Sequence, residues 1–164
     1  MEPARQPATV NAPAGVIARP PLLCLVALLI GFVADWLLPL PWPAWATDLA
    51  HWIVGVALIL LGAALMAAGA RGFTRAGTPV PTVKPTRALV TTGVHGRTRN
   101  PIYLGMFFIY GGIGVAACNA WILILTLPLA LTIRYGVVAR EEAYLERRFG
   151  AAYRDYKARV RRWL

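Results

Sequence analysis

The sequence has few acidic residues, few charged residues of any kind and little cysteine. Its 164 residues include 7 Asp and Glu against 17 Lys and Arg, and charged residues make up 15% of the chain. A soluble domain has about 25% charged residues, so this composition does not fit a water-exposed domain. The high apolar content excludes a disordered chain, and the 2 cysteines exclude a small fold stapled by disulfides. Such a shortage of charge is typical of an integral membrane protein.

Hydrophobic residues take the place of the missing charges, at 58% of the chain with a mean hydropathy of +0.57. Four segments, Leu22–Leu40, Trp52–Ala70, Pro101–Cys118 and Ala120–Ile133, contain a single charge, at Asp35. A helix that crosses a bilayer takes about 20 apolar residues, a length that the fourth segment reaches if it continues to residue 139. We therefore predict an all-α integral membrane protein with four transmembrane helices, over about residues 22–40, 50–70, 101–118 and 120–139.

The basic residues are confined to alternate connections between these helices. Lys and Arg number two in the N-terminal tail, none in residues 41–51, six in 71–100, none at the third connection and nine from residue 134 onward. Basic residues flanking membrane helices stay in the cytoplasm, so we predict that both termini and the 71–100 loop are cytoplasmic. This topology explains the net charge of +10 without nucleic acid, and it makes membrane lipids a partner.

The remaining segments predict the domain organisation. Residues 1–20, rich in Pro and Ala, predict a flexible tail before a single membrane domain over residues 21–164. The third and fourth helices, joined only through residues 118–120, predict a tight hairpin, and residues 140–164 predict cytoplasmic helices that end in an amphipathic basic one. An alternative makes residues 1–46 a cleaved signal peptide, because Ala44-Trp45-Ala46 has the small-x-small form of a cleavage site.

Polar residues that could bind a ligand or take part in catalysis lie close to the predicted membrane face in two places. One is the loop over residues 86–100 with the start of the third helix, where Pro101 suits a first helical position. The other begins at Arg140-Glu141-Glu142. The same two clusters of polar residues would also be expected in a basic membrane anchor whose carboxylates pair with nearby arginines. The residue types alone leave the two interpretations open, and they predict no metal site.

Four motifs occur in order along residues 78–164. They are LVTTGVHGRTRNPIYLG at 89–105, Glu141-Glu142-x-x-Leu145, Phe149-Gly150-x-x-Tyr153-x-x-Tyr156 and Val160-Arg-Arg-Trp163. In this order and spacing they resemble the isoprenylcysteine carboxyl methyltransferase family, which belongs with the membrane phospholipid methyltransferases. The resemblance implies methyl transfer from S-adenosylmethionine to a lipophilic acceptor. It also implies a cofactor pocket at the cytoplasmic ends of the last two membrane helices.

The resemblance also implies which residues form the pocket. The cofactor-binding positions of the family correspond here to Leu89, Val90, His95, Asn100, Pro101, Tyr103 and Glu141, and Glu142 completes the pair of acids. On chemical grounds Arg97 and Arg99 suit the carboxylate of the cofactor. Tyr103 and His95 suit its adenine or its sulfonium.

Two positions depart from the family pattern. Asn100 stands where the family often has His before the Pro, and Val137 stands where eukaryotic members have the arginine that handles the prenylcysteine carboxylate. Arg134 and Arg140, each three residues away, are candidate replacements. A carboxylate acceptor needs no base, whereas a lipid amine must lose a proton, with Glu142 or His95 as the candidate base. The alternatives are a membrane reductase related to sterol reductases, which would bind a nicotinamide cofactor, and a non-catalytic membrane interaction protein.

Overall fold

The computed structural model describes residues 15–43, 49–80 and 85–164. Most of the predicted tail over residues 1–20 and the Ala44-Trp45-Ala46 site lie outside these ranges. The regular structure of the described residues is helical throughout, which confirms the predicted all-α class. Its elements are the helices α1 (Pro20–Leu37), α2 (Leu49–Arg75), α3 (Pro101–Ala116), α4 (Ala120–Ile133), α5 (Ala139–Phe149) and α6 (Ala151–Arg159), the 3-10 turn η3 (Gly93–Gly96) and the π-helical turn η4 (Arg134–Val138).

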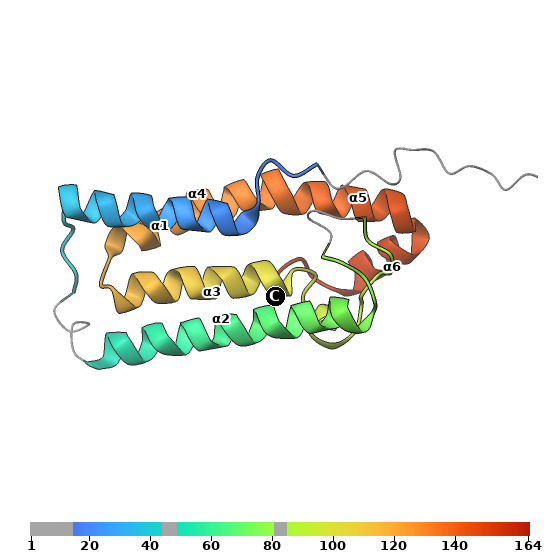
Figure 1. Cartoon of the computed structure of the whole chain (residues 1–164), viewed down its shortest axis with the longest axis horizontal. Coiled ribbons are helices and arrows are strands. Elements are labelled where there is room, and N and C mark those ends of the chain that lie inside the picture. Colours follow the sequence, from blue (N-terminus) through green and yellow to red (C-terminus); the bar gives the residue numbers. More distant parts are fainter. Residues whose placement is uncertain (1–14, 44–48, 81–84) are drawn as a thin grey trace, which may run out of the picture.

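The long helices lie side by side in two layers (Figure 1). One layer holds α1 beside α4, and the other holds α2 beside α3. Residues 38–43 after α1, the start of α2 and the turn from α3 to α4 lie at one end of the bundle. α5, α6 and η3 lie at the other end. The described residues of the connections that lack Lys and Arg thus lie at the opposite end of the molecule from the segments rich in basic residues.

Glycines allow α2 and α3 to pack at very short range. A Cβ placed on Gly55 would meet the backbone of Ala116 and Gly112 at 2.7–2.8 Å, and one placed on Gly105 would meet the carbonyl oxygen of Gly62 at 2.5 Å. Helices in lipid associate through such small residues because their backbones can approach closely. Gly55 and Gly62 of α2 therefore lie on the face that meets α3.

Three helical stretches, Pro20–Leu37, Leu49–Arg75 and Ala120–Phe149, are long and apolar enough to cross a membrane. Large apolar side chains stay exposed along them, among them Leu29, Ile53 and Leu127, as expected of surfaces that face lipid. The third predicted span, α3, is apolar but has only 16 residues. At 1.5 Å per residue it is shorter than a hydrocarbon core of about 30 Å. Four crossings therefore stay a prediction.

The turn between α3 and α4 forms the predicted hairpin. Cys118 adopts a positive φ of 49°, and the side chain of Asn119 accepts a hydrogen bond from the backbone N–H of Ile122 at 3.0 Å. This is the usual way of satisfying a free N–H at a helix start. Cys24 and Cys118 are both free thiols.

The chain runs from α4 through η4 into α5 as one continuous rod (Figure 1). The rod ends at Phe149, and the following Gly150 adopts a positive φ of 55°. The C-terminal helix is shorter than predicted. α6 ends at Arg159, and Val160 is extended, because backbone and side-chain groups of the 98–100 loop bond to residues 160–162 in place of a further helical turn.

Candidate functional site

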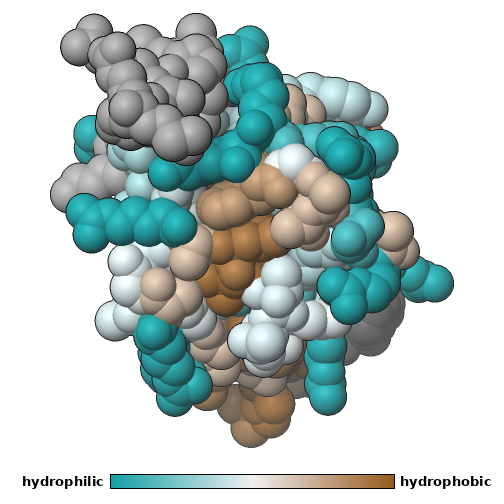
Figure 2. Space-filling model, turned by 90° about the vertical axis from the view of Figure 1, so that its right-hand side faces the viewer, coloured by the Kyte–Doolittle hydropathy of each residue, from teal (hydrophilic) through white to brown (hydrophobic). Residues whose placement is uncertain are grey.

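A cleft opens at the end of the bundle that carries α5 and α6. Figure 2 looks onto this end and shows apolar side chains in a hollow bordered by hydrophilic ones. The cleft encloses about 650 Å³ of space between protein atoms, its open mouth included. Its lining is Phe73, Val80, Thr86, Ala88, Leu89, Val90, His95, Arg99, Asn100, Pro101, Ile102, Tyr103, Glu141, Glu142, Leu145, Tyr153 and Tyr156. The walls thus come from the end of α2, the following loop, the start of α3, α5 and α6.

A tight turn carries His95 into this cleft. Gly93 enters η3 with a positive φ of 63°, which a glycine adopts without strain. The His95 ring then lies edge-on to Phe73, with 4.9 Å between ring centroids, and is only 3% exposed. The hydroxyl of Tyr156 donates to the His95 carbonyl oxygen at 2.7 Å, and burial raises the pKa of Tyr156 to about 12, so that this donor keeps its proton.

The ring nitrogens of His95 have no hydrogen-bond partner within the described part of the chain. Burial lowers the pKa of His95 from its usual 6.5, because a charged imidazole loses hydration there. The ring is therefore neutral near pH 7. A buried polar atom without a partner costs about 1–3 kcal/mol. The His95 ring is thus suited to bonding a ligand in the cleft.

A carboxylate and a phenol meet across the cleft. The hydroxyl of Tyr103, in the first turn of α3, donates to Oε1 of Glu141, in the first turn of α5, at 2.7 Å. Glu141 is 6% exposed and Tyr103 is 7% exposed. A buried charge is stable only when it is paired or hydrogen-bonded, so this contact fixes a negative group in a largely apolar cavity.

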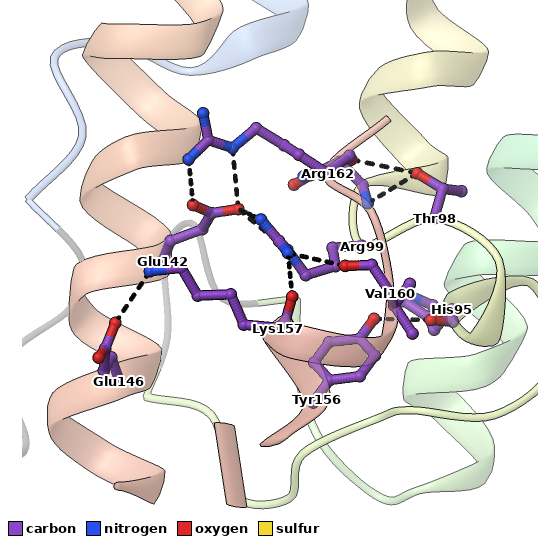
Figure 3. A network of polar contacts seen from close by, with 10 residues as sticks. His95, Thr98, Arg99, Glu142, Glu146, Tyr156, Lys157, Val160 and Arg162 are labelled. Atoms are coloured by element: carbon purple, nitrogen blue, oxygen red, sulfur yellow. Dashed lines mark hydrogen bonds and ion pairs between the residues drawn. The ribbon is translucent and has the colours of Figure 1, made fainter. Parts of the chain in front are cut away.

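The neighbouring acid, Glu142, is held by two arginines (Figure 3). Nη2 of Arg99 lies 2.8 Å from Oε1, and Nη2 of Arg162 lies 2.6 Å from Oε2. Arg99 also donates through Nη1 to the carbonyl oxygens of Lys157 and Val160, at 3.0 and 2.7 Å. The guanidinium of Arg99 is therefore largely occupied by the protein itself, and Glu142 neutralises it.

Thr86 joins the cleft from a part of the loop where sequence reasoning named no site residue. Its backbone N–H donates to the hydroxyl of Tyr144 at 3.1 Å. Its own hydroxyl oxygen is buried and has no hydrogen-bond partner in the described structure. Thr86 and His95 thus place polar atoms in need of partners on the lining of one cavity.

Nine of the residues named from the sequence line the cleft: Leu89, Val90, His95, Arg99, Asn100, Pro101, Tyr103, Glu141 and Glu142. The structure does not bring Arg97, Arg134 or Arg140 to it. Arg97 is exposed beyond the η3 turn. The guanidinium of Arg134 lies 5.3 Å from the Tyr135 ring centroid, and Nη1 of Arg140 donates to the Gly15 carbonyl oxygen at 2.8 Å.

Sequence reasoning missed several of the lining residues, among them Phe73, Thr86, Leu145, Tyr153 and Tyr156. Phe73 lies in the last turn of a long apolar helix and has no local signal of a site. Tyr153 and Tyr156 belong to one of the four motifs, but the segment that contains them predicts only an amphipathic basic helix. The signal that distinguishes them is their position beside Glu141-Glu142 once the chain reverses at Gly150.

The comparison with known proteins agrees with the family that the four sequence motifs resemble. A family model described as phospholipid methyltransferase matches residues 50–152. A stretch of 34 residues is 59% identical to an uncharacterized protein of Haemophilus influenzae, over 21% of this chain and 54% of the relative. The chain thus spans about half the length of this curated relative. Comparison with solved structures gave no match.

Proposed function

Because the chain belongs to the phospholipid methyltransferase family of membrane methyltransferases, we propose that it transfers a methyl group from S-adenosylmethionine to a lipophilic acceptor. The observation that carries the proposal is the unpartnered, buried His95 ring in a cleft built by the family's own motifs. Membership and the exposed apolar helices make it an integral membrane protein. The basic connections favour an orientation with both termini and the cleft in the cytoplasm, where a soluble cofactor is available.

The cleft lining fits this cofactor in its chemical groups. The His95 ring nitrogens and the Thr86 hydroxyl offer partners to the polar groups of a ligand, and Glu141 offers a carboxylate to an ammonium or a ribose diol. Leu89, Val90 and the tyrosines offer apolar and aromatic surface to an adenine. When bound, S-adenosylmethionine would supply a methyl group whose carbon is electrophilic because it is attached to a positively charged sulfur, and S-adenosylhomocysteine would be the leaving group.

The contribution of the protein is alignment and exclusion of water. Tyr103 and Glu141 are locked to each other from two helices, so the groups that would orient a ligand are preorganised. Glu142 is committed to Arg99 and Arg162, which makes it a poor base. His95 is neutral and unpartnered, so it is the better candidate to accept a proton from an amine.

The arrangement of cations bears on the acceptor. Among the described residues, Arg99 is the cation that lines the cleft, and Glu142 neutralises it. Arg134 and Arg140, named as partners for an acceptor carboxylate, make their contacts elsewhere. A lipid amine therefore fits this surrounding better than an isoprenylcysteine-like carboxylate, because the amine needs no cation to neutralise it.

Ligand binding tests the cofactor. We expect the purified protein in nanodiscs to bind S-adenosylmethionine by isothermal titration calorimetry, and His95→Ala to weaken this binding about tenfold or more. If the protein instead bound a reduced nicotinamide cofactor and did not bind S-adenosylmethionine, the reductase alternative would be established. Binding of neither would favour a non-catalytic interaction protein.

The acceptor is tested by transfer of label. Membranes that contain the protein are incubated with S-adenosylmethionine carrying a radiolabelled methyl group, and lipids are separated by class. An N-methylated amine retains the label in mild alkali, whereas a carboxylate methyl ester releases it as methanol. We expect alkali-stable label in an amine-containing lipid. Label that mild alkali removes would show a carboxylate acceptor.

A further inference from the structure

The last residues of the chain lie along the loop that carries the cleft residues. Four bonds join them: the backbone N–H of Arg99 donates to the Arg161 carbonyl oxygen at 3.0 Å, Arg99 Nη1 donates to the Val160 carbonyl oxygen at 2.7 Å, and Thr98 Oγ1 and Asn100 Nδ2 both donate to the Arg162 carbonyl oxygen, at 3.2 and 3.0 Å. Figure 3 shows this segment against Thr98 and Arg99. We call residues 160–164 the C-terminal clasp. It bonds to three consecutive residues directly before the first turn of α3.

Glu142 ties the clasp to α5 through its side chain. Arg162 donates through Nε to Oε1 of Glu142 at 3.1 Å and through Nη2 to Oε2 at 2.6 Å, a two-point contact (Figure 3). Arg99 holds the same carboxylate from the loop side. Two-point arginine–carboxylate pairs fix orientation as well as supplying energy. One buried acid thus joins α5, the loop and the clasp.

Apolar contacts fix the clasp on both sides of Arg162. Val160 packs with Tyr153 and Tyr156, which line the cleft. The Trp163 ring lies edge-on to Phe107 of α3, with 5.8 Å between centroids. Arg162 therefore sits between two packed side chains, so that its guanidinium loses little further freedom on pairing with Glu142.

We propose that Arg162 is a positioning residue for cofactor binding, and that the C-terminal clasp keeps Arg99 and Asn100 in place at the wall of the cleft. The proposal rests on the proposed function, because it concerns the affinity of the same cleft for S-adenosylmethionine. The groups that bind a ligand must be held by a supporting shell, and the clasp supplies that shell from the far end of the chain. The Arg162 side chain acts through Glu142, whereas its backbone carbonyl oxygen accepts the bonds from Thr98 and Asn100.

Loss of the Arg162 side chain is expected to loosen this wall. Glu142 would keep Arg99 but lose both bonds to Arg162, and a buried carboxylate that loses one of two cations shifts toward solvent or its remaining partner. Because Arg99 lines the cleft and also bonds to the clasp, its displacement reaches the cavity directly. The effect should therefore fall on cofactor affinity more than on the acceptor.

The test compares Arg162→Ala with Arg159→Ala in the full chain in nanodiscs. Arg159 is exposed and donates to the Asp155 carbonyl oxygen of its own helix, so this control removes one positive charge three residues away. We expect Arg162→Ala to raise the Kd for S-adenosylmethionine about tenfold, a value typical of coupled sites. The control should stay within about twofold, since surface changes have small effects. KM for the acceptor should be unchanged.

A second readout separates positioning from general destabilisation. Coupling is reciprocal, so S-adenosylmethionine should protect the amides of residues 157–164 from hydrogen exchange in the natural protein but not in Arg162→Ala. Thermal unfolding of each variant is followed in parallel. If Arg162→Ala does not fold, Arg162→Gln, which keeps a neutral donor, is measured in its place.

Two outcomes would overturn the proposal. One is a Kd for Arg162→Ala equal to that of the Arg159→Ala control. The other is a clasp whose hydrogen exchange is unchanged by the cofactor. In both cases the natural protein still binds S-adenosylmethionine. Failure of the proposed function is a different result, in which the natural protein itself shows no binding.

Discussion

At the level of single residues, two adjacent acids have different partners. Neighbouring positions on an α-helix point about 100° apart, so Glu141 meets Tyr103 while Glu142 meets Arg99 and Arg162. Glu141 stands against the apolar part of the cleft, and Glu142 closes the ion-pair network at its edge. The same residue type thus offers a carboxylate to a ligand in one case and joins three segments of chain in the other.

Removal of the Tyr103 hydroxyl tests the first of these contacts. In Tyr103→Phe, Glu141 loses a hydrogen bond to a charged acceptor, worth about 1.5–3 kcal/mol. We expect a loss of stability of this order and weaker binding of S-adenosylmethionine, measured by denaturant unfolding and calorimetry. Tyr110→Phe is the control on the same helix, because the buried Tyr110 hydroxyl has no hydrogen-bond partner among the described residues. Equal effects of the two changes would contradict the role of the Tyr103–Glu141 contact.

Titration of His95 predicts a pH dependence of stability. Burial lowers its pKa in the folded state below the usual 6.5. Between the lowered pKa and 6.5, the unfolded state binds a proton that the folded state does not, so stability rises with pH in this window. The contribution of His95 to stability is fully present above pH 6.5, and it is lost as the pH falls through the lowered pKa of the folded state.

Variants at the two histidines separate this effect. We expect the unfolding free energy of the natural protein to decrease from about pH 6.5 downward, and His95→Gln to remove part of that slope. His51→Gln, at the start of α2, is the control. Denaturant melts at several pH values measure the slope. A slope that His95→Gln leaves intact would show that His95 does not cause it.

At the level of elements, the pairing of α2 with α3 sets where the cleft begins. Gly69, in the last part of α2, faces the side chains of Pro101 and Ile102, and the Gly72 backbone lies against the His95 ring. The close approach of the two helices therefore brings Phe73 and the first turn of α3 to the same cavity. Larger residues on this face would move the wall of the site.

An alanine in α3 tests this packing. A Cβ at Gly112 would lie 2.7 Å from the Gly55 carbonyl oxygen, a backbone atom that cannot turn aside. We expect Gly112→Ala to destabilise the protein by about 1–3 kcal/mol, the cost of overpacking, in denaturant unfolding. The neighbouring Gly111 has nothing within 4 Å of the same position. Gly111→Ala should therefore be neutral or slightly stabilising, and a destabilisation equal to that of Gly112→Ala would contradict the argument.

The π-helical turn η4 joins the apolar α4 to the charged α5. π turns occur often at functional sites because they add a residue and rotate the helix that follows. Here the turn leaves Val137 and Val138 fully buried, and the Gly136 carbonyl oxygen accepts a hydrogen bond from the backbone N–H of Ile17 at 3.2 Å. The segment before α1 is thereby fixed to the base of α5, the helix that carries both acids.

At the level of the whole molecule, polar chemistry is concentrated at one end of an apolar bundle. The cleft, the acid pair and the C-terminal clasp all lie at the end with α5 and α6 (Figure 1). The opposite end carries residues 38–43, which follow α1, and the α3–α4 turn at residue 119, and neither contains Lys or Arg. An apolar bundle with one basic end has a preferred orientation in a membrane.

Reporter fusions test this orientation. We expect a fluorescent protein fused after Leu164 to fluoresce, since it folds in the cytoplasm, and alkaline phosphatase inserted near residue 43 to be active, since it needs an oxidising compartment. Phosphatase fused after Leu164 is the matched control and should be inactive. The reverse pattern of activities would place the cleft on the other side of the membrane.

The sequence by itself determined the helical class, the membrane location and most of the cleft lining. Runs of apolar residues and the placement of charges reflect whether a segment lies in lipid or in water. Each of these signals can be recognised in a window of about 20 residues. The motif at residues 89–105 is also local, because these residues build one loop and one helix start. Local signals of this kind survive any arrangement of the helices.

Only the tertiary structure decided what the charged residues do. Arg97, Arg99, Arg134 and Arg140 look equivalent in the sequence, yet Arg99 alone of these lines the cleft, and it pairs with an acid 43 residues away. Arg162 is the second arginine that pairs with Glu142. It lies in a segment that was predicted to belong to the final amphipathic helix, beyond the observed end of α6. Ion pairs and orphaned polar atoms depend on which surfaces the fold brings within about 3 Å. That distance is a property of the folded chain as a whole, which no window of sequence contains.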